Sequence, residues 1–109
     1  MKSAVLLVFT AACGADPTGG SVDGETVYQS MCSSCHGPTG KPTAAMAARL
    51  SVRDLTDPAV RTKLTPQVIE AQIRNGSTNK LMPSFSGAMS EEQIKSVAAH
   101  IASPAFLKR

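Results

Sequence analysis

The sequence predicts an all-α fold, with three main helices and several short ones. Apolar residues recur every three or four positions in the first and last parts of the chain. A Ser, Thr or Asp repeatedly stands just before such a stretch, where it can cap a helix. No segment alternates apolar and polar residues between turn signals, as a strand or hairpin does. These observations favour a single small helical domain.

The first expected helix begins after Asp23 and ends near His36, where Gly37 and Pro38 interrupt helical geometry. Its apolar side chains have helical spacing and lie on one stripe: Val27, Tyr28, Met31, Cys32 and Cys35. The two cysteines therefore lie on the same face as the packing residues.

The middle of the chain contains three further helical stretches. Residues 43–50 form a short Ala-rich stretch with the spacing of a helix. Asp57 and Thr65 each precede a proline, which pairs a capping residue with Pro at the first helical position. We expect the Asp57 helix to run through Lys63 and the Thr65 helix to reach about Asn75.

The last expected helix begins with a capping box from Ser90 to Gln93, with acidic residues at the positive end of the helix dipole. Its apolar residues recur at i, i+3, i+4 and i+7: Ile94, Val97, Ala98 and Ile101. Pro104 ends it.

Size and composition suit a domain built around a cofactor. The chain has 109 residues, of which 42% are hydrophobic but only 4% aromatic, with no Trp. A core so poor in large side chains gains from a covalently held group. The formal charge of +3 comes without a basic stripe interleaved with aromatics, so we expect no nucleic-acid partner.

The N-terminus has the pattern of an export signal. Residues 1–12 join a positive start to an apolar run too short to span a membrane. Small residues before Cys13 resemble the bacterial lipoprotein cleavage box, in which the cysteine becomes the lipidated first residue of the mature chain. Thr10 differs from that pattern, which usually has an aliphatic residue at this position. The alternative is an ordinary signal peptide with Cys13 incidental. We expect a flexible tether over 13–23 and the domain over 24–109.

Cys32-Ser33-Ser34-Cys35-His36 has the C-x-x-C-H pattern by which haem c is attached. Two thiols one helical turn apart can each form a thioether with one vinyl group, and His36 can present its imidazole to the iron. A thioredoxin-like dithiol is the first alternative, but it requires a βαβ context. Half of a zinc site is the second, but a closed site needs four ligands, and the chain has three Cys and two His.

Met82 is the candidate for the second axial ligand. It lies in a loop after a helix stop, with Pro83 restricting the backbone and Phe85 available to pack beside a porphyrin. A thioether sulfur favours ferrous iron and raises the reduction potential. Met89 is the alternative methionine, and ligation by His100 is a further alternative.

The order of these features resembles the class I cytochromes c of the small bacterial periplasmic kind, over residues 24 to about 103. The matching pieces are Gly24-x-x-x-Tyr28, Cys32-x-x-Cys35-His36-Gly37, Ile73-x-x-Gly76, Met82-Pro83-x-Phe85 and the terminal helix. The resemblance implies one covalent haem c and a crossing of the first and last helices at Gly24 and Tyr28.

The resemblance also implies that a proline carbonyl accepts a hydrogen bond from His36, and Pro42 and Pro38 are both open for this role. His100 stands where the family commonly has an aromatic residue, so we expect it to pack near the helix crossing. Three cations, Arg49, Arg53 and Lys80, are either partners of the haem propionates or ordinary surface charges.

The predicted function is one-electron transfer, because an iron ligated on both sides leaves no position for a substrate. We therefore expect a monomeric, exported, periplasmic carrier and not an enzyme. It would serve larger redox complexes through short-lived contacts, and a lipid anchor would hold it near a membrane. A peroxidase-like haem enzyme and a gas-binding or sensing module are the alternatives if Met82 is not a stable ligand.

Overall fold

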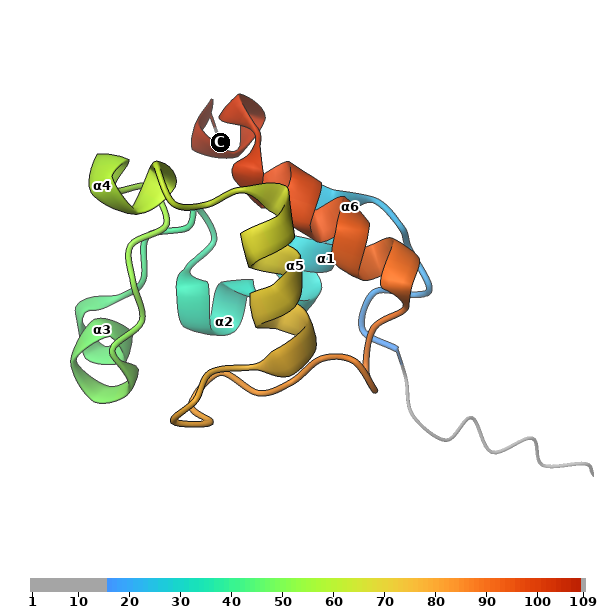
Figure 1. Cartoon of the computed structure of the whole chain (residues 1–109), viewed down its shortest axis with the longest axis horizontal. Helices are drawn as coiled ribbons and strands as arrows, with labels where there is room; N and C mark the ends of the chain where they lie inside the picture. Colours follow the sequence, from blue (N-terminus) through green and yellow to red (C-terminus); the bar gives the residue numbers. More distant parts are fainter. Residues whose placement is uncertain (1–15, 109) are drawn as a thin grey trace, which may run out of the picture.

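The computed structural model describes residues 16–108, and every regular element in that range is helical, which confirms the all-α fold class. In chain order the elements are α1 (Gly24–Met31), α2 (Ser33–His36), α3 (Ala44–Leu50), α4 (Pro58–Arg61), α5 (Pro66–Asn75), α6 (Glu91–Ala102) and a 3₁₀ helix η1 (Pro104–Lys108). Helices α1, α5 and α6 form the packed body, and α3 and α4 lie to one side of it (Figure 1). None of these helices has the length and apolar character needed to cross a bilayer. The expected signal peptide, residues 1–12, and Cys13 lie outside the described residues.

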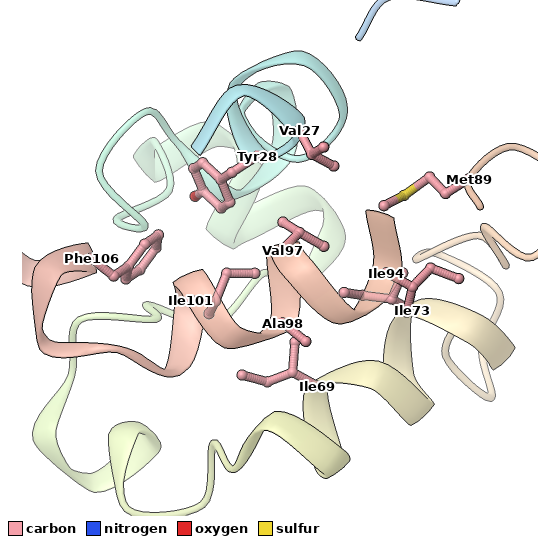
Figure 2. Packing of buried hydrophobic residues seen from close by; sticks show 10 residues of the cluster. All are labelled: Val27, Tyr28, Ile69, Ile73, Met89, Ile94, Val97, Ala98, Ile101 and Phe106. Atoms are coloured by element: carbon pink, nitrogen blue, oxygen red, sulfur yellow. The ribbon is translucent and has the colours of Figure 1, made fainter. Parts of the chain in front are cut away.

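Helix α6 is the centre of the core, because its apolar stripe contacts α1 on one side and α5 on the other (Figure 2). The four residues of the predicted stripe, Ile94, Val97, Ala98 and Ile101, are all buried. Figure 2 shows Val97 pointing toward α1 and Ala98 toward Ile69 of α5. Full burial of each large aliphatic side chain contributes about 1.5–3 kcal/mol, so this stripe fixes the three-helix arrangement.

Helices α1 and α6 approach closely at Gly24. A Cβ atom on Gly24 would lie 2.5 Å from the Ser96 carbonyl oxygen and 2.7 Å from the His100 Cβ. Tyr28, one turn further along α1, is fully buried, and its ring lies 6.4 Å from that of His100. The structure thus confirms that Gly24, Tyr28 and His100 lie at this crossing, where only glycine allows such contact.

The four predicted caps are present, and Thr43, expected inside the helix over 43–50, is a fifth cap that was not predicted. The side chains of Asp23, Thr43, Asp57, Thr65 and Ser90 each accept a hydrogen bond from a backbone N–H in the first turn of the helix that follows. Both bonds of the capping box between Ser90 and Gln93 are made. Each cap satisfies a backbone donor that has no partner within its helix.

The expected continuous helix over 24–36 is wrong, because the chain forms two helices separated at Cys32. Cys32 has φ −117° and ψ −32°, and α1 ends before it. Its N–H still donates to the Tyr28 carbonyl at 2.9 Å, and its own carbonyl accepts from the His36 N–H at 3.0 Å. The backbone bonds therefore continue across the break.

Helix α4 is also shorter than predicted, since it ends at Arg61 and not at Lys63. Thr62 and Lys63 turn the chain back, and the Lys63 N–H donates to the Val60 carbonyl at 3.0 Å. The early end places Lys63 in a turn and not on a helix face.

The 3₁₀ helix η1 was not expected, because Pro104 in the sequence indicates only that α6 ends there. It buries Phe106 completely, and the Phe106 ring packs edge-to-face against Tyr28, at 5.1 Å, and His100, at 5.6 Å. Phe106 therefore adds an aromatic ring beside His100, which stands where the family commonly has an aromatic residue.

Arg61 connects α4 to the C-terminal end of α6. Its guanidinium donates to the carbonyls of Ile101, at 2.6 Å, and Ser103, at 3.2 Å, and lies 5.5 Å from the centre of the Phe106 ring. The last carbonyls of a helix lack partners and form the negative end of its dipole. Arg61 therefore caps α6 from another element.

Residues 16–21, in the range expected as a tether, are hydrogen-bonded to the start of α6. The Gln93 side-chain amide donates to the Thr18 hydroxyl at 2.9 Å and to the Ser21 carbonyl at 2.8 Å. Thr18 is only 7% exposed, and the Asp16 carboxylate accepts from its N–H at 2.9 Å. This part of the chain thus contacts the domain.

Candidate haem site

A cavity of about 540 Å³ lies beside α5, bounded by α2, by the segment from the end of α3 to the start of α5, and by the loop after α5. This volume is within the range of roughly 300–1,000 Å³ common for cofactor sites. Its walls are mostly aliphatic and aromatic side chains. Four of the five predicted site residues, Cys32, Cys35, His36 and Met82, line it, and the fifth, Cys13, lies outside the described residues.

The two thiols face this cavity from α2 and the break before it. Cys32 and Cys35 are both free and half-buried. Within residues 16–108, no three His, Cys, Asp or Glu side chains are grouped so that they could hold a metal ion. The two thiols and His36 all line the same cavity, as attachment to a large planar group requires.

Burial, with the neighbouring Cys35 as a smaller cause, raises the pKa of Cys32 to about 12. The thiolate is the nucleophile in disulfide exchange, and redox-active dithiols have a thiol pKa near or below the ambient pH. This environment is therefore unlike that of a thioredoxin-type dithiol.

His36 has a neutral imidazole with one unused nitrogen. Burial lowers its pKa, so the ring is uncharged at neutral pH, which is the form that binds metals. Its Nδ1 atom is buried and has no hydrogen-bond partner within residues 16–108. A buried polar atom without a partner is costly, and a metal-bound histidine usually donates from its second nitrogen to a carbonyl. The ring thus fits the role of an axial haem ligand.

The turn after His36 depends on Gly37. Gly37 has φ 81°, and a Cβ there would collide with the Lys41 carbonyl oxygen. The Tyr28 hydroxyl donates to the Gly37 carbonyl at 2.6 Å, which links the turn to the helix crossing. Of the two proline carbonyls considered for His36, that of Pro38 already accepts from the Gln29 side chain at 2.9 Å.

Met82 lies in the loop that follows the C-terminal end of α5, and hydrogen bonds to Ser77 close this loop. The Ser77 N–H donates to the Met82 carbonyl at 2.9 Å, and the Met82 N–H donates to the Ser77 hydroxyl oxygen at 3.0 Å. The Ser77 hydroxyl in turn donates to Asn79 Oδ1 at 2.6 Å. Ser77 therefore fixes the backbone of Met82 in both directions.

Gly76 connects two of the sequence motifs physically. It ends α5 with φ 74°, and a Cβ on it would lie 2.7 Å from the Met82 carbonyl oxygen and 2.9 Å from the Pro83 carbonyl carbon. The Phe85 N–H donates to the Ile73 carbonyl at 2.9 Å. The Ile73-x-x-Gly76 and Met82-Pro83-x-Phe85 motifs are therefore two sides of one contact that positions the Met82 loop.

The alternative ligands do not reach the cavity. Met89 is 6% exposed and belongs to the hydrophobic core, where Figure 2 shows it near the start of α6. His100 packs its ring against Tyr28 and Phe106 and is not among the residues that line the cavity. Of the two methionines considered as ligands, Met82 is thus the one that lines the cavity.

Two cations line the cavity, and the sequence analysis named only one of them. Of the three cations considered as partners of the haem propionates, Arg53 lines the cavity, whereas Arg49 and Lys80 do not. Lys63 lines it as well. No motif in the sequence marks Lys63, which lies in the turn after α4.

The chain is similar to known cytochromes in both sequence and structure. The family model described as cytochrome c oxidase, cbb3-type, subunit III matches residues 22–101. A cytochrome c6 from Nostoc sp. is 33% identical over 81 residues, which cover 74% of this chain and 68% of that protein. The solved structure of the KustC0563 c-type cytochrome superposes with a TM-score of 0.66 at 28% identity and covers 73% of this chain and 94% of its own.

The fold and the cavity, with its two thiols and neutral histidine, define a small protein that binds haem covalently. The chain belongs to the cytochrome c family, as a small class I member with one haem c. It is accordingly a c-type haem electron carrier, whose redox partners bind transiently.

Proposed function

We propose that this protein carries single electrons on a haem attached through Cys32 and Cys35, with His36 and Met82 as its axial iron ligands. The observation that supports this assignment is the convergence of all four side chains on one apolar cavity from two separate segments of the chain. Bound haem supplies an iron that alternates between the ferrous and ferric states. The chain's own residues hold the ring, exclude water from it and fix the ligands on each side.

The closed loop around Met82 disfavours the enzymatic and gas-binding alternatives. Both require an iron position that opens readily to a small molecule. Here the Met82 backbone is bonded to Ser77 in both directions and packs against Gly76. His36 and Met82 would then hold a bound haem from both sides and leave no open position for a substrate.

We propose Pro42 as the acceptor for His36 Nδ1. The Pro38 carbonyl is already engaged by Gln29, whereas the Pro42 carbonyl has no hydrogen-bond partner within the described residues. The contact between Gly37 and Lys41 returns the chain to the vicinity of His36 just before Pro42. A bond to this carbonyl would also make the imidazole a stronger iron ligand.

We also propose that the protein is exported to the periplasm and held at a membrane by acyl chains on Cys13, where it acts as a monomer. The pattern of residues 1–13 supports this proposal. Because Thr18 and Ser21 are bonded to Gln93, only residues 14–17 would separate Cys13 from the first of these contacts. Five extended residues span at most roughly 17 Å, so the anchored domain would stay close to the lipid surface.

Intact-mass measurement of exported, matured protein tests these proposals together. We expect the mass of the chain from Cys13 plus one haem plus acyl chains, and a ferric spectrum with the methionine-to-iron charge-transfer band. Matured protein without covalent haem would refute the electron-carrier proposal. A haem-bearing chain that starts elsewhere than Cys13 would refute only the anchor, and rapid reaction of its iron with peroxide would favour the enzyme.

Ser77→Ala should loosen the Met82 ligand. The variant loses the hydroxyl bonds to Met82 and Asn79, and a net loss of about 1 kcal/mol would raise the population of the open loop roughly fivefold. Carbon monoxide binding to the ferrous protein should accelerate by about that factor. Ser86→Ala is the matched control, because Ser84 donates to the same Arg74 carbonyl. Equal rates in the two variants would contradict the role of Ser77.

A further inference from the structure

We propose that Tyr28 is a positioning residue for His36. Its hydroxyl holds the turn over residues 37–42, which supplies the hydrogen-bond acceptor for His36 Nδ1, and this contact lowers the reduction potential. The assignment rests on the proposed function, in which His36 ligates the haem iron. Tyr28 does not line the cavity, so it acts through the turn and not by contact with the haem.

The hydroxyl of Tyr28 is not needed for packing at the helix crossing. Tyr28 is fully buried, and its ring meets the rings of His100 and Phe106 edge-to-face (Figure 2). A phenylalanine ring can make the same contacts, since they use only the apolar body of the side chain. A buried hydroxyl costs free energy unless it is hydrogen-bonded, and this one donates to the Gly37 carbonyl at 2.6 Å. The turn that it reaches therefore explains why the hydroxyl is there.

The turn over residues 37–42 is closed on itself. The Gly40 N–H donates to the Gly37 carbonyl at 3.2 Å, so this carbonyl accepts from both Gly40 and Tyr28. At the same residue, a Cβ would collide with the Lys41 carbonyl oxygen, which shows how closely the two ends of the turn approach each other. The Gly37 carbonyl is therefore the point at which α1 holds the whole turn.

The side chain next to Tyr28 fastens the following carbonyl. The amide of Gln29 donates to the Pro38 carbonyl at 2.9 Å. Two successive residues of α1 thus engage two successive carbonyls at the start of the turn. His36 Nδ1 is buried and has no hydrogen-bond partner within residues 16–108. The Pro42 carbonyl, at the far end of the turn, is the acceptor proposed above, and its position depends on where α1 holds the start.

The other side of the turn is held by the cavity wall and by η1. The Gly40 carbonyl accepts from the Leu55 N–H at 2.9 Å, and Leu55 lines the cavity. The Phe106 ring packs on Gly40, where a Cβ would lie 2.5 Å from it. Loss of the Tyr28 hydroxyl would release the turn on one side only. We therefore expect the turn to shift and loosen without unfolding.

This positioning has an electrochemical consequence. A carbonyl that accepts from the second nitrogen of a ligating imidazole makes that imidazole a more basic ligand. A more basic ligand favours ferric iron, which has the higher positive charge, and so lowers the reduction potential. Removing the Tyr28 hydroxyl should weaken the bond from His36 Nδ1 and raise the potential. The Nδ1 proton should also exchange with solvent roughly fivefold faster, as expected for the net loss of about one hydrogen bond.

The experiment uses Tyr28→Phe, which removes only the hydroxyl, in the purified holo-protein. We measure the midpoint potential by potentiometric titration and the exchange of the His36 Nδ1 proton by NMR of the ferrous protein. Ser103→Ala is the matched control, because its hydroxyl donates to the His100 carbonyl, also at 2.6 Å, away from the turn. Val27→Ala controls for stability, since Val27 is fully buried in α1 and does not line the cavity. We expect the potential and the exchange rate to rise in Tyr28→Phe alone.

Wild-type values of both quantities in Tyr28→Phe would overturn the inference, and the hydroxyl would then contribute to stability alone. Shifts of the same size in Val27→Ala would overturn it as well, because they would follow from any loss of packing in α1. Gln29→Ala is the second test, and it decides the matter if Tyr28→Phe fails to fold. It removes the bond of an exposed side chain to the same turn, so a smaller rise in both quantities supports the inference and unchanged values refute it.

Covalent haem in the wild type is measured first, by its alkaline pyridine spectrum. Its absence would refute the proposed function itself. Haem that is present, with a potential and an exchange rate that do not respond to either α1 variant, would refute only the role of Tyr28.

Discussion

A Met82→Ala protein should have a reduction potential lower by about a few tenths of a volt, within the range of about 0.8 V over which axial ligands set haem potentials. The thioether sulfur stabilises ferrous iron, and alanine offers no ligand in its place. Gly76 and Ser77 would still hold the loop backbone, so the vacant position would not be closed by collapse of the chain. The ferrous protein should therefore bind carbon monoxide readily, and the ferric charge-transfer band should vanish.

Met89→Ala is the matched control, because it removes a methionine from the core and not from the cavity. Met89 is 6% exposed, so this variant should lose about 2–5 kcal/mol of stability while its potential stays near the wild-type value. Potentiometric titration of both variants separates the two roles. An unchanged potential in Met82→Ala would remove Met82 from the iron, and a shift confined to Met89→Ala would point to the alternative ligand.

The sequence predicted most of the fold because its signals are local. A cap and the N–H that it satisfies lie within three residues of each other, and all four predicted caps are present in the structure. The C-x-x-C-H stretch is equally local, since one short segment contains two thiols and an imidazole, and all three line the cavity. Periodicity placed the α6 stripe correctly for the same reason.

The features that the sequence did not reveal depend on contacts between distant segments. Arg61 caps α6 across 40 residues of sequence, and no local pattern marks it for that role. Lys63 lines the cavity from the turn after α4, which ends two residues earlier than predicted. The Ser77 contact with Met82 requires a loop to close on itself, which neither residue signals alone. In each case a polar side chain finds its partner only after the helices have packed.

The burial of Phe106 was not predicted from the sequence. Its removal should have the largest effect on stability. Phe106→Ala should lower the free energy of unfolding by about 3–5 kcal/mol, as expected for a fully buried phenylalanine. The ring packs against Tyr28 and His100, and the Arg61 guanidinium lies over it. Since 1 kcal/mol shifts Tm by roughly 4–8 °C in a domain of this size, the holo-protein should melt at least about 12 °C lower.

Leu107→Ala is the control for Phe106, because Leu107 is the next residue in η1 but is 48% exposed. A substitution at such a surface position usually changes stability by less than about 0.5 kcal/mol. Equal melting temperatures for the two variants would show that η1 does not support the core. A Phe106→Leu variant should recover part of the loss by refilling the space without the edge-to-face contacts.

The effect of Phe106 should extend to the haem ligand as well as to the core. A Cβ on Gly40, which has φ 91°, would lie 2.5 Å from the Phe106 ring, so the ring packs directly on the turn that follows His36. The Gly40 carbonyl accepts from the Leu55 N–H at 2.9 Å, which ties the same turn to the segment on the cavity wall. Phe106→Ala should therefore broaden or shift the haem spectrum at temperatures below global unfolding, whereas Met89→Ala, a core loss away from this turn, should not. A spectrum that changes only with global melting in both variants would limit Phe106 to a packing role.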